Sequence, residues 1–337
     1  MEQKNAPPQD YILVEEKRLL DFVDSCFQRA SLTPEHAAVI ARLLVNSDLR
    51  GVRSHGSRNL NGYARGLQNG ALNPRPQIRP VHQIAAATVF DGDGTLGYWP
   101  MVQAAKQAVV HARQTGLGLG LVRHIGHYGS AGHYARICQE AGCIGFSAQG
   151  YRNEGFDRGE TPPTSVGYSG DPPFSFAIPG GQKEGVVLDA GANIFGFYNG
   201  KEDYQDLLAR LPGAFFRSMG LIAVATLLGG ALTGFTGPQA DAVQQRWAGA
   251  GNGGMVLAID LKQLVEPQQF AAEADRYARD LAAHYAPIPG TDRVQLPGAL
   301  EAERFERYRR QGIPYGEPEQ AAAHAASQHF DVPLPWD

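Results

Sequence analysis

Two short segments carry the side chains that could perform acid–base chemistry on a small polar substrate. The first, DLRGVRSHGSR at residues 48–58, places Ser54, His55 and Arg58 within five positions, directly after an apolar helical pattern. An arginine can hold a carboxylate through two parallel hydrogen bonds, and a serine and a histidine can bind the neighbouring oxygen. Solvated polar residues at a helix C-terminus show the same spacing. Both interpretations therefore stay open on spacing alone.

The second segment, RHIGHYGSAG at residues 123–132, lies between an apolar strand pattern and a helical one. Sheets of α/β proteins place reactive groups at such strand ends. A histidine can give or take a proton near neutral pH, which reduction of a ketone or imine requires alongside hydride transfer. His124, His127 and the following His133 also suggest a metal site, but no carboxylate shares their spacing and the glycine turn separates two of them. We therefore predict no metal.

Glycine-rich stretches are frequent, but the phosphate-binding motifs are missing from the sequence. No GxGxxG unit stands between a strand and a helix with an acidic residue about twenty positions later, and GLGLG at residues 116–120 falls inside a strand pattern. The GxxxxGK[ST] loop and the GxSxG elbow are also missing. A standard Rossmann site, an NTPase and an α/β-hydrolase are all disfavoured.

The elements that must position these residues follow from apolar periodicity and turn residues. Thr33 is a suitable N-cap for a helix that ends near Gly51, and a DGDG turn at residues 91–94 ends a strand. We predict helices at about 15–30, 34–50, 99–115, 131–141, 267–284 and 301–311. We predict strands at about 85–90, 117–122, 143–148, 174–178, 185–188 and 255–259. The connections are an extended segment at 69–80, a long loop at 151–173 and an irregular tail with one short helix from Pro314. The alternation predicts a mixed α/β architecture.

Composition limits the class of protein. The chain has 337 residues, more than one core of ~250–300 residues usually holds, so we expect more than one subdivision. A formal charge of −4 without any basic run argues against a nucleic-acid partner. Cys26, Cys138 and Cys143 cannot all pair and lack zinc-binding spacing, and the N-terminus lacks the pattern of a secretory signal. We expect reduced thiols and a cytoplasmic location.

One segment approaches the length of a membrane span. From Ser218 to Ala240 there is no charged residue. A buried helix packed in a protein interior is favoured by Gly220, Gly229, Gly230 and Gly234, by the following Pro238 and by the lack of a second such segment. We predict no membrane insertion.

Several long motifs resemble the type-2 malate/L-lactate dehydrogenases. They are LVNSDLRGVRSHGSRNLNGYARGLQNGALNPRP, GLGLGLVRHIGHYGSAGHYA, and ALTG followed later by NGGMVLAID. The resemblance covers about residues 10–312. That family includes dehydrogenases and reductases for ureidoglycolate, sulfolactate, diketogulonate and the cyclic imine piperideine-2-carboxylate.

The resemblance implies a malate/L-lactate dehydrogenase-like α/β fold with a mixed sheet and a helical subdomain, and not a standard Rossmann fold. We expect residues 1–80 to form the N-terminal helical subdomain, completed by helices of residues 261–337. Residues 81–260 would then form the α/β domain that binds cofactor and substrate. The resemblance also implies an obligate homodimer that binds NAD or NADP.

By position, the resemblance assigns roles to the two chemical segments. His127 matches the histidine of a His-aromatic-Gly motif and His55 that of an SHG motif, and both are candidates for proton transfer. Ser54 and Arg58 match substrate-pocket residues, with Arg58 as the carboxylate clamp and Tyr63 as a neighbour. The substrate would be a small carboxylate-bearing molecule.

The cofactor-binding residues implied by the resemblance are Asp171, Phe174, Asp189, Arg217 and Gly298. Here the chain departs from the family pattern. Asp171 lies in GDPP where GTNP is common, Asp189 begins DAGAN where DMATS is usual, and Arg217 stands where a lysine is usual. The PGA segment around Gly298 also lacks the common acidic residue.

Three hypotheses of function follow. The first is an oxidoreductase that transfers a hydride between a nicotinamide cofactor and a small 2-oxo or 2-hydroxy acid, or a cyclic 2-imino acid. The second is a divergent enzyme that has lost the dinucleotide and performs acid–base chemistry, such as isomerisation, elimination or cyclisation, on a carboxylated substrate. The third is a catalytically silent scaffold, which would not need two histidine segments.

Overall fold

The computed structural model describes residues 5–151, 170–181, 185–195, 203–287 and 293–337. The long loop predicted at 151–173 lies mostly outside these residues. The helices are α1 (Glu16–Arg29), α2 (Pro34–Leu49), α3 (Leu60–Gln68), α4 (Tyr98–Thr115), α5 (Gly132–Glu140), α6 (Asp203–Arg210), α7 (Pro212–Gly229), α8 (Pro238–Arg246), α9 (Pro267–His284), α10 (Ala299–Gln311) and α11 (Glu317–Phe330). The strands are β1 (Ile12–Val14), β2 (Arg79–Ile84), β3 (Ala87–Asp91), β4 (Leu117–Ile125), β5 (Cys143–Tyr151), β6 (Pro173–Ile178), β7 (Val186–Gly191), β8 (Asn252–Asp260) and β9 (Ile313–Tyr315).

The centre of the molecule is a seven-stranded sheet in the order β2-β3-β4-β8-β5-β6-β7. Only the β3–β4 pair is parallel, and the other five pairs are antiparallel. Doubly wound Rossmann sheets are mostly parallel. The mixed sheet therefore confirms the predicted fold class and the expectation that this is not a standard Rossmann fold.

Helices α4 and α5 cover one face of the sheet. Gly118 and Gly120 of β4 lie directly against α4, and a Cβ atom at either position would overlap a backbone carbonyl oxygen, that of Ala108 or of Ala104. Close approach of a helix to a strand is a common reason for glycine in a strand. The GLGLG segment is therefore a packing surface inside a strand, as its apolar pattern predicts.

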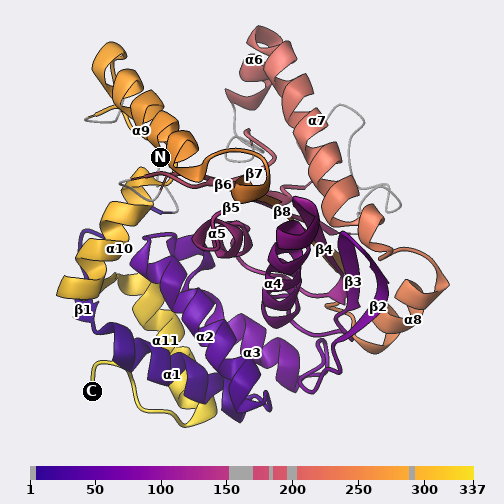
Figure 1. Ribbon diagram of the computed structural model, residues 1–337. Coiled ribbons are helices and arrows are strands. Elements are labelled where there is room, and N and C mark those ends of the chain that lie inside the picture. Colours follow the sequence, from indigo (N-terminus) through magenta and orange to yellow (C-terminus); the bar gives the residue numbers. More distant parts are fainter. Residues whose placement is uncertain (1–4, 152–169, 182–184, 196–202, 288–292) are drawn as a thin grey trace.

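The two ends of the chain pack together at one side of the sheet. Helices α1, α2 and α3 lie beside α10 and α11, so indigo and yellow segments intermingle in Figure 1. β1 pairs with β9 in a small antiparallel sheet, with Ile12 opposite Tyr315. One continuous core joins this helical part to α4 and the sheet, with Leu19, Leu44 and Met101 fully buried in it.

Most predicted elements are present, and the C-terminal tail is the main exception. Residues from Pro314 onward form the end of β9 and the 14-residue helix α11, where we predicted irregular chain with one short helix. The alanine-rich sequence of α11 carries few large apolar side chains, so its periodic pattern is weak. Strand β2 was not predicted, because it is exposed along its whole length and its sequence shows no alternation of apolar and polar residues.

The expectation that the apolar segment after Ser218 forms a buried helix packed in a protein interior is wrong for the single chain. Residues 212–233 form the one helical segment, among the described residues, with the length and apolarity to cross a membrane, yet only 33% of its most apolar window is buried. One stripe of α7 faces β5, namely Phe215, Ser218, Ile222, Ala225 and Gly229. The opposite side is also apolar, with Phe216 73% and Leu227 59% exposed. Because two opposite sides of α7 are apolar, its composition does not reveal which of them the chain itself covers.

Candidate active site

His127 is held by the turn that follows β3. The β4–β8 register shifts between Val122 and Ile125, which bends the end of β4. Backbone N–H groups of the 92–97 turn then bond the segment leading to His127. Gly92 and Gly94 donate to the carbonyl oxygens of Arg123 and His124, both at 2.9 Å, and Gly97 donates to that of His127 at 3.0 Å. The DGDG turn therefore positions the second chemical segment.

The His127 ring is hydrogen-bonded through Nδ1. The backbone N–H of Gly129 donates to Nδ1 at 3.1 Å, and the hydroxyl of Tyr63, from α3, lies 2.8 Å from the same atom. Burial, together with the nearby His55, lowers the pKa of His127 to about 4. Neutral imidazole is therefore its state at physiological pH.

His55 lies against His127. It ends the 3-10 turn η1 (Arg53–His55), and its Nδ1 is 3.0 Å from the Ser54 hydroxyl. The centroids of the His55 and His127 rings are 5.9 Å apart, with an angle of 17° between their planes. The structure thus brings together Ser54, His55, Tyr63 and His127 from both segments, and each keeps part of its surface accessible.

Arg58 follows in the next 3-10 turn, η2 (Ser57–Asn59), and faces the C-terminal helix. Its Nη1 is 3.9 Å from Oε1 of Glu319, whose side chain is only 2% exposed. The two oxygens of Glu319 also accept from Nε and Nη2 of Arg53, at 3.1 and 2.5 Å. Arg53 satisfies both carboxylate oxygens of Glu319, so the 35%-exposed Arg58 side chain retains donors for another anion.

A buried acid supports the same turn from below. Asp48 of α2 accepts a hydrogen bond from the backbone N–H of Ser57 at 2.9 Å, and the Ser57 hydroxyl pairs with that of Tyr315. A Cβ at Gly56 would collide with the Asp48 carboxylate, so this position requires glycine. Burial raises the pKa of Asp48 to about 7, against the lowering effect of the Ser57 hydrogen bonds.

His124 of the second segment and the following His133 have structural partners. His124 has a positive φ of 58° and its Nδ1 is 3.1 Å from Asp91. His133 is buried between Asn46 and Ser47 of α2, and burial holds its pKa well below the usual range. Among the described residues, no group of three or more His, Cys, Asp or Glu side chains converges as metal ligands would.

The five residues implied as cofactor ligands lie around β7 and the start of α7. Asp171 accepts from the backbone N–H of Asn193 at 2.8 Å, and Asp189 accepts from the Ser130 hydroxyl. Both carboxylates thus make internal bonds.

The remaining three differ in their surroundings. Phe174 packs against the small cluster around Ile222, Gly298 at φ 92° packs on Val187, and Arg217 is exposed on α7. An exposed guanidinium can bind a phosphate, whereas the carboxylates of Asp171 and Asp189 are engaged in internal bonds.

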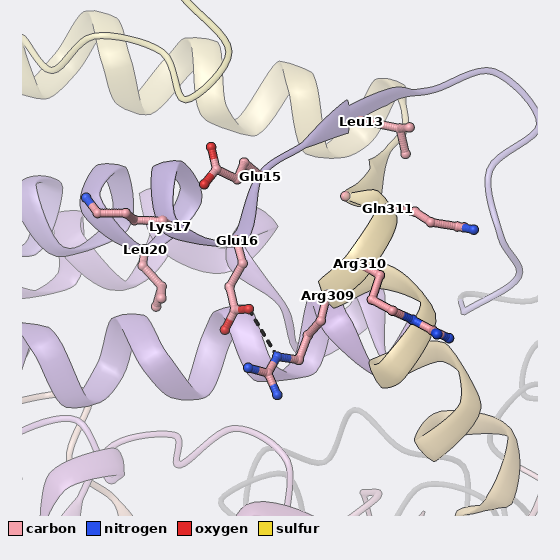
Figure 2. A pocket seen from close by; sticks show the side chains of 9 residues that line it. Leu13, Glu15, Glu16, Lys17, Leu20, Arg309, Arg310 and Gln311 are labelled. Carbon is pink, nitrogen blue, oxygen red and sulfur yellow. Dashed lines mark ion pairs between the residues drawn. The ribbon is translucent and has the colours of Figure 1, made fainter.

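One open hollow is lined by neither His55 nor His127. A volume of about 570 Å³ opens between α1 and the end of α10 (Figure 2). Its walls carry charges of both signs, and Arg309 pairs with Glu16 at 3.4 Å across it. Such an open, internally neutralised hollow offers no preference for one ligand charge.

Comparison with known proteins identifies the family. The sequence profile described as malate/L-lactate dehydrogenase matches residues 14–195 and 201–322. The chain belongs to this family. The expected family resemblance is thereby confirmed, and so is the expectation of an enzyme of the dehydrogenase type.

Relatives within the malate/L-lactate dehydrogenase family match different shares of the chain. The malate dehydrogenase of Pyrococcus horikoshii is 36% identical over 147 residues, which cover 44% of this chain and only 41% of that enzyme. Ureidoglycolate dehydrogenase (NAD(+)) of Escherichia coli strain K12 is 25% identical over 315 residues, which cover 85% of this chain and 87% of that enzyme. The solved structure of malate dehydrogenase from Pyrococcus horikoshii OT3 has a TM-score of 0.82, with 23% identity and 98% of both chains covered. This likeness shows the shared fold.

Sequence reasoning missed three groups that support the site. Asp48 lies inside the first chemical segment, but in the sequence it looks like a solvent-exposed carboxylate at the end of a helix. Glu319 and Tyr315 lie more than 250 positions from their partners, Arg53 and Ser57, so no local spacing links them. The only local signal was the glutamate three residues after Gly316, which caps α11 through the Gly316 N–H.

Proposed function

We propose that this member of the malate/L-lactate dehydrogenase family transfers a hydride between NAD or NADP and a small 2-oxo or 2-hydroxy acid, or a cyclic 2-imino acid. The observation that carries the proposal is the stacked His55–His127 pair, whose rings are suited to proton exchange with a substrate. Arg58, three positions after His55 in the next 3-10 turn, is the cation proposed to hold the substrate carboxylate. The similar enzymes named malate and ureidoglycolate dehydrogenase support the same reaction class.

The residues divide the work in this proposal. Arg58 and Ser54 bind the substrate carboxylate, and Tyr63 contacts His127, which faces the reacting carbon. His127 and His55 are the candidates for proton exchange. A bound reduced nicotinamide would supply the hydride.

The cofactor site is proposed around β7. Arg217 is the residue that would hold a phosphate, beside Phe174 and the backbone at Gly298. Asp171 and Asp189 would shape the site through their bonds to Asn193 and Ser130. The site would prefer NADP over NAD if a cation binds the 2′-phosphate of NADP. The binding experiment below measures this preference.

The alternative of a redox-independent acid–base enzyme has less support. It rests on the altered cofactor motifs, yet the similar enzymes carry dehydrogenase names and the pair of histidines suits either reaction. It becomes the better hypothesis if the protein binds neither nucleotide.

We also propose a homodimer in the cytoplasm. The support for a dimer is the apolar outer side of α7, where Phe216, Val224 and Leu227 are more than half exposed. Contiguous apolar surface of this kind marks interfaces. The support for a reducing compartment is that all three cysteines are buried and unpaired, with burial raising the thiol pKa of Cys26 to about 12.

The test is fluorescence titration of the purified chain with NADH and NADPH, followed by turnover of 2-oxo and cyclic imino acids. We expect micromolar binding, about −8 kcal/mol. We expect His127→Asn to lower kcat/KM about 100-fold or more while nucleotide affinity stays unchanged. The matched control is His82→Asn on exposed β2. Failure of the folded protein to bind either nucleotide would overturn the proposal.

A further inference from the structure

The hydrogen bonds at Nδ1 of His127 determine where its proton lies. The backbone N–H of Gly129 points at Nδ1 from 3.1 Å. A backbone amide can only donate, so Nδ1 must offer its lone pair. The proton of the neutral imidazole is therefore on Nε2. The Tyr63 hydroxyl, 2.8 Å from the same Nδ1, must also donate to it.

The surroundings of the ring keep this arrangement neutral. The titratable groups that face His127 are Tyr63 from α3, with Tyr98 of α4 edge-on behind it, and His55 from η1. A second proton would have to enter Nδ1 and would face the fixed N–H of Gly129. Burial and the adjacent His55 oppose that proton as well, which agrees with a His127 pKa of about 4.

We propose that His127 works as a neutral imidazole that donates a hydrogen bond from Nε2, and that Tyr63 is the positioning residue whose hydroxyl donates to Nδ1. The site therefore selects a substrate whose reacting atom accepts a hydrogen bond. The inference rests on the function proposed above and narrows its substrate class. The carbonyl oxygen of a 2-oxo acid accepts such a bond. A protonated cyclic imine presents an N–H, which cannot pair with the Nε2–H of His127.

The proton transfer balances through the ring. As the carbonyl carbon receives a hydride, the carbonyl oxygen takes the Nε2 proton of His127 to become the hydroxyl. Nδ1 takes the hydroxyl proton of Tyr63, which leaves a neutral imidazole and a tyrosinate. After the product leaves, the Nδ1 proton returns to the Tyr63 oxygen while solvent protonates Nε2 of the partly exposed His127, which restores the starting tautomer. In the reverse direction the same atoms move back.

Relative basicity favours this direction of transfer. Burial raises the pKa of Tyr63 to about 12. The alkoxide that forms on a reduced ketone is a stronger base than a tyrosinate, much as hydroxide is, since bulk water has a pKa of ~15.7. The Tyr63 proton can thus move toward the substrate oxygen without a charged imidazolium as an intermediate.

The first test needs no turnover. NMR of the 15N-histidine-labelled protein, with His127 assigned by loss of its signals in His127→Gln, distinguishes the two neutral tautomers and the imidazolium. We expect a bare Nδ1 and a protonated Nε2, unchanged between about pH 5 and about pH 9. A protonated Nδ1, or an imidazolium signal within that range, would overturn the inference.

The second test uses Tyr63→Phe, with Tyr277→Phe on exposed α9 as the matched control. We expect kcat for 2-oxo acids to fall about 100-fold with KM nearly unchanged, while the His127 tautomer persists because the Gly129 N–H remains. The solvent isotope dependence should change from two protons in flight to one. Equal kcat in Tyr63→Phe and wild type would contradict the relay, as would faster turnover of a protonated cyclic imine than of 2-oxo acids. Absence of all turnover with an intact Nε2–H tautomer would instead reject the proposed function alone.

Discussion

The two faces of the seven-stranded sheet differ in how completely the single chain covers them. On one face, α4 and α5 lie so close that Gly118 and Gly120 touch helix backbone, and residues such as Met101 are fully buried. On the other face, α7 buries one stripe and leaves a second apolar side exposed to solvent. In Figure 1 this helix extends beyond the sheet.

This difference separates what one chain covers by itself from what it leaves exposed, where we propose that a second copy binds. The histidine pair belongs to the completed part, because its supports come from α2, α3, the 92–97 turn and the C-terminal α11. The dinucleotide region proposed around β7 adjoins the uncovered α7. We therefore expect substitutions on the completed side to act on folding, and those on α7 to act on assembly.

The largest effect is expected where helix and strand backbones meet. The double substitution Gly118→Ala with Gly120→Ala places two methyl groups where they overlap backbone carbonyl oxygens of α4. Such overpacking lowers the free energy of unfolding by about 1–3 kcal/mol per site. We expect a loss of about 5 kcal/mol in the free energy of unfolding, measured by urea denaturation.

The matched control is Gly62→Ala on α3, where nothing lies within 4 Å of the added methyl group. A helical glycine replaced by alanine in open space should gain about 0.5–1 kcal/mol. Equal effects of the two changes would mean that β4 and α4 are not in such close contact.

The next effect concerns the acid enclosed beneath the first chemical segment. Because the pKa of Asp48 is raised to about 7 in the folded state, the native protein keeps a proton that the unfolded chain has lost above about pH 4. Stability from this group therefore falls as the pH rises from about 4 to about 7, by at most about 4 kcal/mol. His127, whose pKa is lowered, changes stability in the opposite direction between about pH 4 and about pH 6.5.

Asp48→Asn isolates the first contribution, because wild type and variant share His127. We expect the variant to be more stable than wild type at about pH 8 by up to about 4 kcal/mol, with the difference shrinking toward pH 4. Thermal unfolding across this range measures it, with Asp10→Asn at an exposed position as the control. A difference that does not vary with pH would show that Asp48 is ionised in the native state.

Substitutions on the outer side of α7 are expected to have the smallest effect on the stability of the single chain. They are expected to have the largest effect on dimer formation. Leu227→Lys places a charge on the apolar outer side, and Val110→Lys on α4 is the control at a comparably exposed site. We expect the first variant to sediment as a monomer and the control as a dimer. The unfolding free energy of the dissociated chain should change by less than about 0.5 kcal/mol. A Leu227→Lys variant that remains a dimer would place the interface elsewhere.

Local pattern determined much of the fold in advance. The helix capped by Thr33, the helix from Pro267 to His284 and the strand that contains most of the GLGLG segment follow from periodicity and capping alone. The two chemical segments were also recognisable, because serine, histidine and arginine side chains cluster within a few positions of one another. Such features depend on neighbours in the sequence, which the sequence displays directly.

Tertiary structure decided which of these residues meet and what supports them. The contact between His55 and His127, the bonds from Glu319 to Arg53, and the burial of Asp48 beneath Gly56 join positions whose separation in the chain carries no periodic signal. The exposed side of α7 was undecided for a related reason. Apolar composition indicates that a surface is more stable when buried. Only the folded structure shows which of these surfaces the chain itself buries.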